Sequence, residues 1–357
     1  MWMHSLATSL ASVAGLAAAA VCLSAAERAL GMPRIGGDEF AAAAGPRPNP
    51  PRGFIAALRR MTTGMIAERR VPASPAARVG AFVLLAAELT AFAAVPFGPE
   101  LVAGGNAAAL RPVIVPGLEA GLLWVLAAWG LANVAALAAA ESPAEMLSAA
   151  RRGATAAALV AAVLGVVATG GTLAIEGLVE AQARSGVWGL FDHPLGFVAF
   201  ALCSHSLCTR HGMNAADRPA FAAVRRAFPS AFAVAFTMQR LLAAYLVVEL
   251  FLGGWHLWGP PPGGGAAAAT DWGGWALRIG ILHAKALAVM WAWARWGARV
   301  RLREGAWRAA ISLGLVDFAV ALVPFEGLFE NAAWLARGAI GWSAVAGIVG
   351  MRKQAAR

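Results

Sequence analysis

Four residues with metal-binding side chains lie within nine positions of one another in the stretch ALCSHSLCTRHG, residues 201 to 212. They are Cys203, His205, Cys208 and His211. Cysteine sulfur and histidine nitrogen are common zinc ligands, and three residues at intervals of three share a broad face of a helix. The stretch is compatible with a metal site. The alternative, which we favour, is a buried cysteine beside polar loop residues, since free cysteine often packs as a small apolar side chain.

The composition predicts that this stretch belongs to an integral membrane protein. Of the 357 residues, 60% are hydrophobic and only 13% are charged, whereas soluble domains carry about 25% charged residues. The net charge of +10 does not indicate nucleic acid as a partner, because the basic residues are spread over alternate loops. The three cysteines imply no disulfide framework.

Eight apolar segments are long enough to cross a bilayer, which takes roughly 20 residues of helix. They run over residues 5–26, 76–97, 113–139, 154–178, 187–208, 229–252, 274–294 and 307–325, and a ninth, 331–350, is interrupted by Arg337. We predict one all-α integral membrane domain over residues 1–357, a polytopic transmembrane helix bundle of eight spans, with the ninth left open. The first segment is interpreted as a retained span and not a signal peptide, because no Lys or Arg precedes it.

Residues 51–70 are predicted to form an amphipathic helix on the membrane surface. Apolar residues recur there at helical spacing, and four arginines occupy the remaining positions. A helix within a soluble loop is the alternative.

The distribution of arginine and lysine predicts the orientation. Residues 27–78, 209–228 and 295–308 are rich in Arg, as is the short connection that contains Arg151 and Arg152, whereas residues 253–273 are rich in Gly and Pro and contain no basic residue. Basic loops stay in the cytoplasm, so the N-terminus and residues 253–273 are expected outside. The basic loop 295–308 could bind another protein of a complex or anionic lipid. The alternative is that its arginines reflect only the preference of basic residues for cytoplasmic loops.

Seven short motifs occur in the order and spacing of a known membrane protein family. They are ERALG (27–31), GPRPNPPRGF (45–54), AVPFGP (94–99), GLLWVLA (121–127), LVEAQ (178–182), HPLGF (193–197) and FLGGWH (251–256). In these motifs the chain resembles the membrane-embedded H subunit of NADH-quinone oxidoreductase, respiratory complex I. The resemblance extends to about Trp307.

This resemblance implies a protein that forms the membrane side of a quinone chamber and links the peripheral electron-transfer arm to the proton-translocating membrane arm. It implies a bacterial inner membrane, the other oxidoreductase subunits as partners, and quinone as the substrate of the complex. No redox centre, cofactor or metal is expected in this chain, and Arg210 and His211 fall at loop positions of the family.

The chain departs from the family in its acidic residues. The family's acidic loop after the fifth span corresponds here to LCTRHGMNAADRPAF, in which only Asp217 is acidic. Non-acidic residues stand at family carboxylate positions: Leu207, Asn214, Pro219 and Phe221 in this loop, Val160 in the fourth span and Phe236 in the sixth. The alternatives are therefore a structural anchor that has lost the quinone and proton roles, a membrane hydrogenase component of the same superfamily, or an unrelated transporter.

Two sets of residues are candidates for the site. The quinone-chamber candidates, matched by the resemblance, are Glu27, Arg34, Arg47, Arg52, Arg210 and Asp217. The buried-charge or proton-path candidates are Glu88, Arg240, His283, Lys285 and Asp317, because charges inside spans are costly. The second set is expected either to carry protons or to pair, Arg240 with Glu88 and Lys285 with Asp317. Glu249 is expected near a membrane interface.

Overall fold

The computed structural model describes residues 74–101, 113, 115, 118–208, 221–257, 272–296, 306–323 and 333–355, and these form helices joined by short turns. The helices are α4 (Pro75–Ala93), α5 (Gly121–Ala138), α6 (Pro143–Gly170), α7 (Ile175–Ser185), α8 (Gly189–Asp192), α9 (Pro194–Cys208), α10 (Ala222–Ala227), α11 (Pro229–Phe251), α12 (Trp272–Trp296), α13 (Ala306–Ala321) and α15 (Ala333–Ala355). The predicted all-α fold is confirmed. The predicted first span and the amphipathic helix 51–70 lie outside the described residues.

Local signals account for where the first long helices begin. The hydroxyl of Ser74 accepts from the N–H of Ala77 at 3.2 Å, and Pro75 occupies the first turn of α4. In the same way, the Ser142 hydroxyl accepts from the N–H of Glu145 at 3.3 Å and Pro143 follows it. Serine caps and first-turn prolines satisfy or remove the N–H groups that a helix leaves unpaired at its start.

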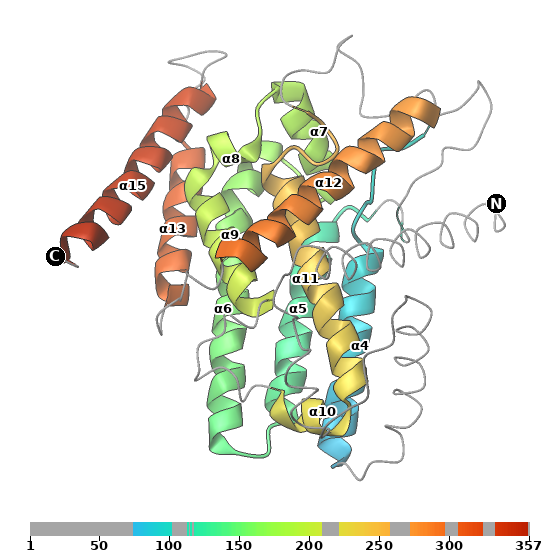
Figure 1. Cartoon of the computed structure of the whole chain (residues 1–357). Helices are drawn as coiled ribbons and strands as arrows, with labels where there is room; N and C mark the ends of the chain where they lie inside the picture. Colours follow the sequence, from blue (N-terminus) through green and yellow to red (C-terminus); the bar gives the residue numbers. More distant parts are fainter. Residues whose placement is uncertain are drawn as a thin grey trace.

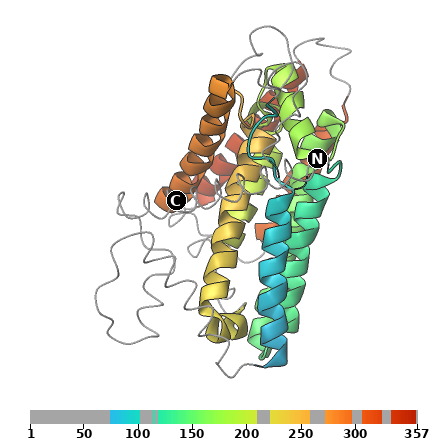
Figure 2. The same cartoon turned by 90° about the vertical axis from the view of Figure 1, so that its right-hand side faces the viewer.

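Five of the described helices form a closed ring. Helix α4 packs on α5, α5 on α6, α6 on α9, α9 on α11, and α11 returns to α4. Helix α12 lies outside this ring against α11, and α13 lies outside against α6 and α9 (Figure 1). Figure 2 shows α4 and α5 side by side along their length. Large buried aromatic side chains fill the ring, among them Trp129, Phe200, Tyr245 and Phe251.

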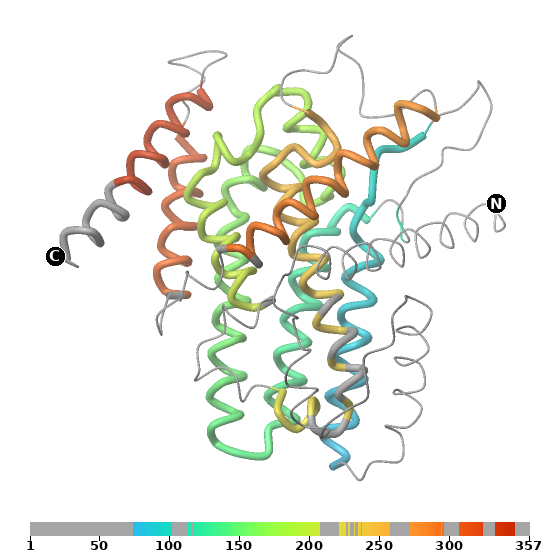
Figure 3. The backbone as a smooth tube through the Cα atoms, in the orientation of Figure 1, coloured from blue at the N-terminus to red at the C-terminus, as the bar shows by residue number. Residues whose placement is uncertain are grey.

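The two ends of the bundle carry different elements. Helices α7 and α8 lie at one end and α10 lies at the other (Figure 3). Helix α15 runs obliquely past α13 and contacts α8 and α9 at the first of these ends (Figure 1). We call it the α7–α8 end below.

Four helices of the described part are long and apolar enough to cross a membrane: α4, α5, α6 and the first 22 residues of α12. Each of them overlaps a predicted span. Helices α9 and α11 fall within predicted segments, although α9 has only 15 residues, and α13 and α15 overlap the last two segments. The number of spans over the whole chain stays a prediction.

Two predicted boundaries were wrong. The segment 154–178 is not one helix, since α6 begins at Pro143 and ends before Gly171, whose φ of 67° is left-handed. The segment 187–208 is broken at His193, because the residue before a proline is disfavoured in the helical conformation and α9 starts at Pro194.

Candidate functional site: buried polar groups of the bundle

All six quinone-chamber candidates lie outside the residues that the structure describes. These are Glu27, Arg34, Arg47, Arg52, Arg210 and Asp217. Their assignment stays a prediction. The five buried-charge candidates are all described, and their contacts test the two pairings given above.

Glu88 is held by a tryptophan and not by the predicted arginine. The indole Nε1 of Trp129 donates to Glu88 Oε2 at 3.3 Å, and Oε1 has no hydrogen-bond partner in the described part of the chain. The pairing of Glu88 with Arg240 was therefore wrong, although Arg240 is also buried and has interactions of its own. The reason is geometric: the face of α4 that carries Glu88 meets Trp129 of α5.

Arg152 lies inside the bundle, although its sequence context predicted a place in a cytoplasmic connection. It is a residue of α6, its Nη2 donates to the carbonyl oxygen of Leu207 at 3.0 Å, and its guanidinium carbon lies 5.4 Å from the ring centre of Phe221. A backbone oxygen and an aromatic ring therefore contact this buried cation.

Glu249 is fully buried within the bundle, with 0% of its surface exposed, and its expected place near a membrane interface stays a prediction. Neither carboxyl oxygen has a hydrogen-bond partner in the described residues. One turn earlier on α11, the ring of Tyr245 meets that of His283 edge to face, with the centroids 5.6 Å apart. The Nδ1 of His283 lies 2.8 Å from the carbonyl oxygen of Ile279 and donates to it. Helix α12 thus turns its histidine toward α11.

Lys285 binds backbone carbonyl groups and not Asp317, so this predicted pairing was wrong. Its Nζ donates to the carbonyl oxygens of Leu252 at 2.6 Å, Gly254 at 3.0 Å and His256 at 2.5 Å. The turn that follows α11 therefore takes up all three donors of the ammonium group.

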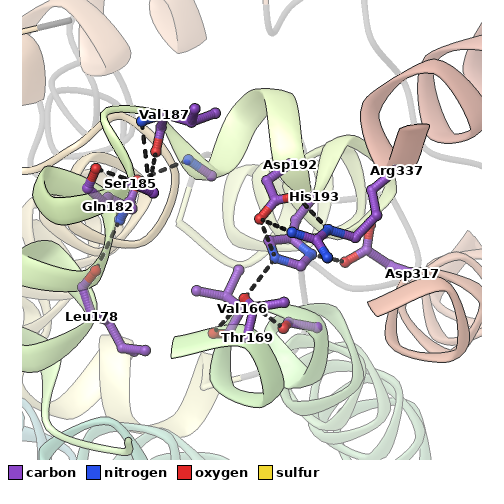
Figure 4. A network of polar contacts seen from close by, with 12 residues as sticks. Val166, Thr169, Leu178, Gln182, Ser185, Val187, Asp192, His193, Asp317 and Arg337 are labelled. Atoms are coloured by element: carbon purple, nitrogen blue, oxygen red, sulfur yellow. Dashed lines mark hydrogen bonds and ion pairs between the residues drawn. The ribbon is translucent and has the colours of Figure 1, made fainter. Parts of the chain in front are cut away.

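Asp317 instead belongs to a polar network at the α7–α8 end (Figure 4). Its Oδ2 lies 3.0 Å from His193 Nδ1, and the opposite ring nitrogen, Nε2, lies 2.9 Å from the Thr169 hydroxyl and 3.4 Å from Asp192 Oδ2. Asp192 also accepts two hydrogen bonds from Arg337, the shorter one 2.5 Å from Nε to Oδ1. Four helices and one junction thus meet here: α6, α8, α13, α15 and the residue that joins α8 to α9.

Two glycines make room for the Asp317 carboxylate. A Cβ atom added to Gly165 of α6 would collide with Asp317 Oδ2 and lie 2.9 Å from His193 Nδ1. A Cβ atom on Gly196 of α9 would lie 2.9 Å from the same carboxylate oxygen. We call these two residues the glycine notch. The acid of α13 reaches the histidine because both neighbouring helices lack a side chain at this point.

The charges in the network support one another. His193 and Asp192 lie at the junction of α8 and α9, outside the helices that could cross a membrane. Burial by itself would lower the pKa of His193, but hydrogen bonds and charge from Asp192 and Asp317 outweigh it and raise the pKa to about 9. Burial likewise works against the Asp192 carboxylate, and His193 and Arg337 nevertheless hold its pKa below the usual value. These contacts favour the protonated form of His193 and the ionised form of Asp192.

Sequence reasoning missed His193, Asp192 and Arg337 as partners. The signal was present in the sequence, because Arg337 interrupts an apolar segment and a charge there needs a counter-charge. The counter-charge was Asp192, within the segment 187–208.

Three of the family-like motifs meet at the α7–α8 end. The side-chain amide of Gln182, in LVEAQ, donates to the carbonyl of Glu249 at 2.7 Å, and its oxygen accepts from the N–H groups of Gly189 at 2.8 Å and Gly253 at 3.1 Å. Gly253 belongs to FLGGWH, and HPLGF begins at His193. Gln182 therefore ties α7 to α8 and to the end of α11.

The part of the chain that the structure describes contains no group of three or more His, Cys, Asp and Glu side chains that could hold a metal ion. Cys203 and His205 are buried, and the His205 ring lies 6.1 Å from that of Trp293. His211 lies outside the described residues, so the complete cluster is not covered by this statement.

The fold and these buried groups define a polytopic helical membrane protein whose charged residues are held between helices. The sequence model of the NADH dehydrogenase family matches residues 39–322, about four fifths of the chain. The chain belongs to the NADH dehydrogenase family, and it is a membrane subunit of the complex I type. The match ends just after α13, so α15 lies beyond it.

Proposed function

We propose that this chain is the H subunit of a bacterial NADH-quinone oxidoreductase, where it forms the membrane side of the quinone chamber. In this proposal it links the peripheral electron-transfer arm to the membrane arm of a proton-translocating complex in the inner membrane. The observation that carries the proposal is the family match over residues 39–322 together with the seven motifs. The chain itself would hold no redox centre, and electrons would come from partner subunits.

Within this proposal, the chamber residues are Glu27, Arg34, Arg47, Arg52, Arg210 and Asp217. The arginines would orient the quinone headgroup, and the two acids would exchange protons with it. Asp217 is the main candidate for this proton exchange, because it is the only acidic residue in the loop that follows the fifth predicted span.

The experiment compares quinone reduction in membranes from Asp217→Asn, Glu27→Gln and wild-type strains. NADH-to-quinone turnover is normalised to the amount of assembled complex, measured on native gels. We expect Asp217→Asn to assemble normally and to lose most of its turnover, since the amide keeps the size and removes the titratable group. Glu119→Gln, at an exposed position, is the matched control and should keep wild-type turnover. Wild-type turnover in both test variants would contradict the chamber role.

A second candidate function is a structural anchor that keeps the fold without the quinone and proton roles. The observation that favours it is that Lys285 and Asp317, two proton-path candidates, are engaged by backbone carbonyls and by His193. Under this alternative, loss of chamber residues leaves turnover unchanged while loss of the chain prevents assembly. Mass spectrometry of the proteins that copurify with the chain identifies the complex in either case.

A further inference from the structure

The turn after α11 surrounds the ammonium group of Lys285 with neutral oxygen atoms. The carbonyl oxygens of Leu252, Gly254 and His256 lie 2.5 to 3.0 Å from Nζ, and we call these three the carbonyl cage. On another side, the ring centre of Trp188 lies 4.4 Å from the same nitrogen. An ammonium has three donors, so the cage satisfies all of them.

The cage is built by the backbone of the turn. Gly253 and Gly254 adopt φ values of 71° and 53°, which favour glycine, and they reverse the chain directly after α11. Gln182 accepts from the N–H of Gly253, which fixes the turn from the opposite side. The carbonyl of Leu252, the C-terminal capping residue of α11, lies at the negative end of the helix dipole.

The atoms that surround Lys285 Nζ determine which kind of cation the turn can bind. In the described part of the chain, no carboxylate oxygen lies within ion-pair distance of Lys285. Carbonyl oxygens and an aromatic face attract a monovalent cation, whereas protein sites for divalent ions rely on carboxylates. His256 adds no competing charge, because burial and the charges of Arg278 and Lys285 lower the pKa of its ring to about 4.

We propose that the turn 252–256 is a binding site for a monovalent ammonium-type cation, and that Lys285 is its built-in ligand. The site positions α12 against α11, since it ties a side chain in the middle of α12 to the end of α11. Lys285 is accordingly a positioning residue and not a member of a proton path. This inference does not depend on the quinone role of the chain.

The test is chemical rescue of the Lys285→Ala variant of the full chain, purified in detergent. Removing the side chain leaves the three carbonyl oxygens without their donors, so we expect the melting temperature to fall by roughly 5 °C. Methylammonium chloride at about 0.1 M should restore at least half of this loss, because binding to the folded state stabilises it. Tetramethylammonium has the same charge but no N–H donor, and should restore nothing.

Two controls separate the cage from general effects of salt. Wild-type protein and Arg295→Ala, which removes an exposed cation from the same helix, should show no selective response to methylammonium. An unchanged melting temperature in Lys285→Ala, no rescue by methylammonium, or equal rescue by both salts would each overturn the proposal.

A measurement on the wild-type chain keeps the proposal testable if Lys285→Ala does not fold. An amine-acetylating reagent is applied to native and to denatured protein, and modification of Lys285 is followed by peptide mass spectrometry. Because the three hydrogen bonds must open before the amine reacts, we expect at least about tenfold slower modification in the native protein. Equal rates in both states would exclude the cage.

Discussion

His193 and Asp317 are 124 residues apart in the chain, yet His193 Nδ1 lies 3.0 Å from Asp317 Oδ2. The contact fastens α13 to the junction of α8 and α9, and Arg337 adds α15 through Asp192. Because both carboxylates and the histidine are largely buried, each charge depends on its partners for stability. The network is therefore expected to contribute strongly to the packing of the outer helices on the ring.

Loss of one partner should cost more than loss of both. Asp317→Asn leaves a buried imidazolium with one carboxylate fewer, and we expect a loss of about 3 kcal/mol in the free energy of unfolding. In the double variant Asp317→Asn with His193→Gln no cation is stranded, so the combined loss should be smaller than the sum of the two single losses. Denaturant unfolding in detergent measures all three variants. Strictly additive losses would show that the two side chains do not interact.

The stability of the protein should decrease in alkaline solution. The folded pKa of His193, about 9, lies above the ordinary value of 6.5. Its contribution, on the order of 3 kcal/mol, is therefore complete below pH 6.5 and is lost as the pH rises through about 9. Melting temperatures of the wild type should fall between pH 7 and 10, whereas His193→Gln should show a flatter profile. Parallel profiles for the two proteins would contradict this assignment.

The glycine notch provides a steric test on a single helix. Gly165→Ala places a methyl group against Asp317 and His193, and we expect a loss of about 2 kcal/mol in unfolding free energy. Gly153→Ala is the matched control on the same helix, because an added Cβ there meets no atom within 4 Å. Alanine favours the helix over glycine, so this control should gain up to about 1 kcal/mol. Equal effects at the two sites would mean that the notch is not tight.

The arginine pattern predicts the orientation, and labelling tests this prediction. In variants with a single cysteine, an impermeant thiol reagent added to intact cells should modify a cysteine introduced at Gly264, in the loop 253–273 without basic residues. A cysteine introduced at Arg301, in the basic loop 295–308, should react only after the cells are opened. The opposite result would reverse the proposed topology.

Much of the fold follows from local features of the chain. Apolar length predicted helices where α4, α5, α11, α12 and α13 lie, because a span needs only enough consecutive apolar residues and a backbone that bonds within itself. The seven motifs led to the family that the match over residues 39–322 shows. Boundaries were less predictable where a glycine or proline ended a helix inside an apolar run, as at Gly171 and Pro194.

The partners of the buried charged residues could not be predicted from local sequence features. The sequence predicted Lys285 as the counter-charge of Asp317. In the folded chain, Lys285 instead binds three carbonyl groups, and Asp317 contacts His193. A helix forms through bonds between neighbours in the chain, whereas an ion pair depends on which faces of two helices meet. Two glycines from other helices admit the Asp317 carboxylate, and their effect exists only once α6, α9 and α13 are packed together.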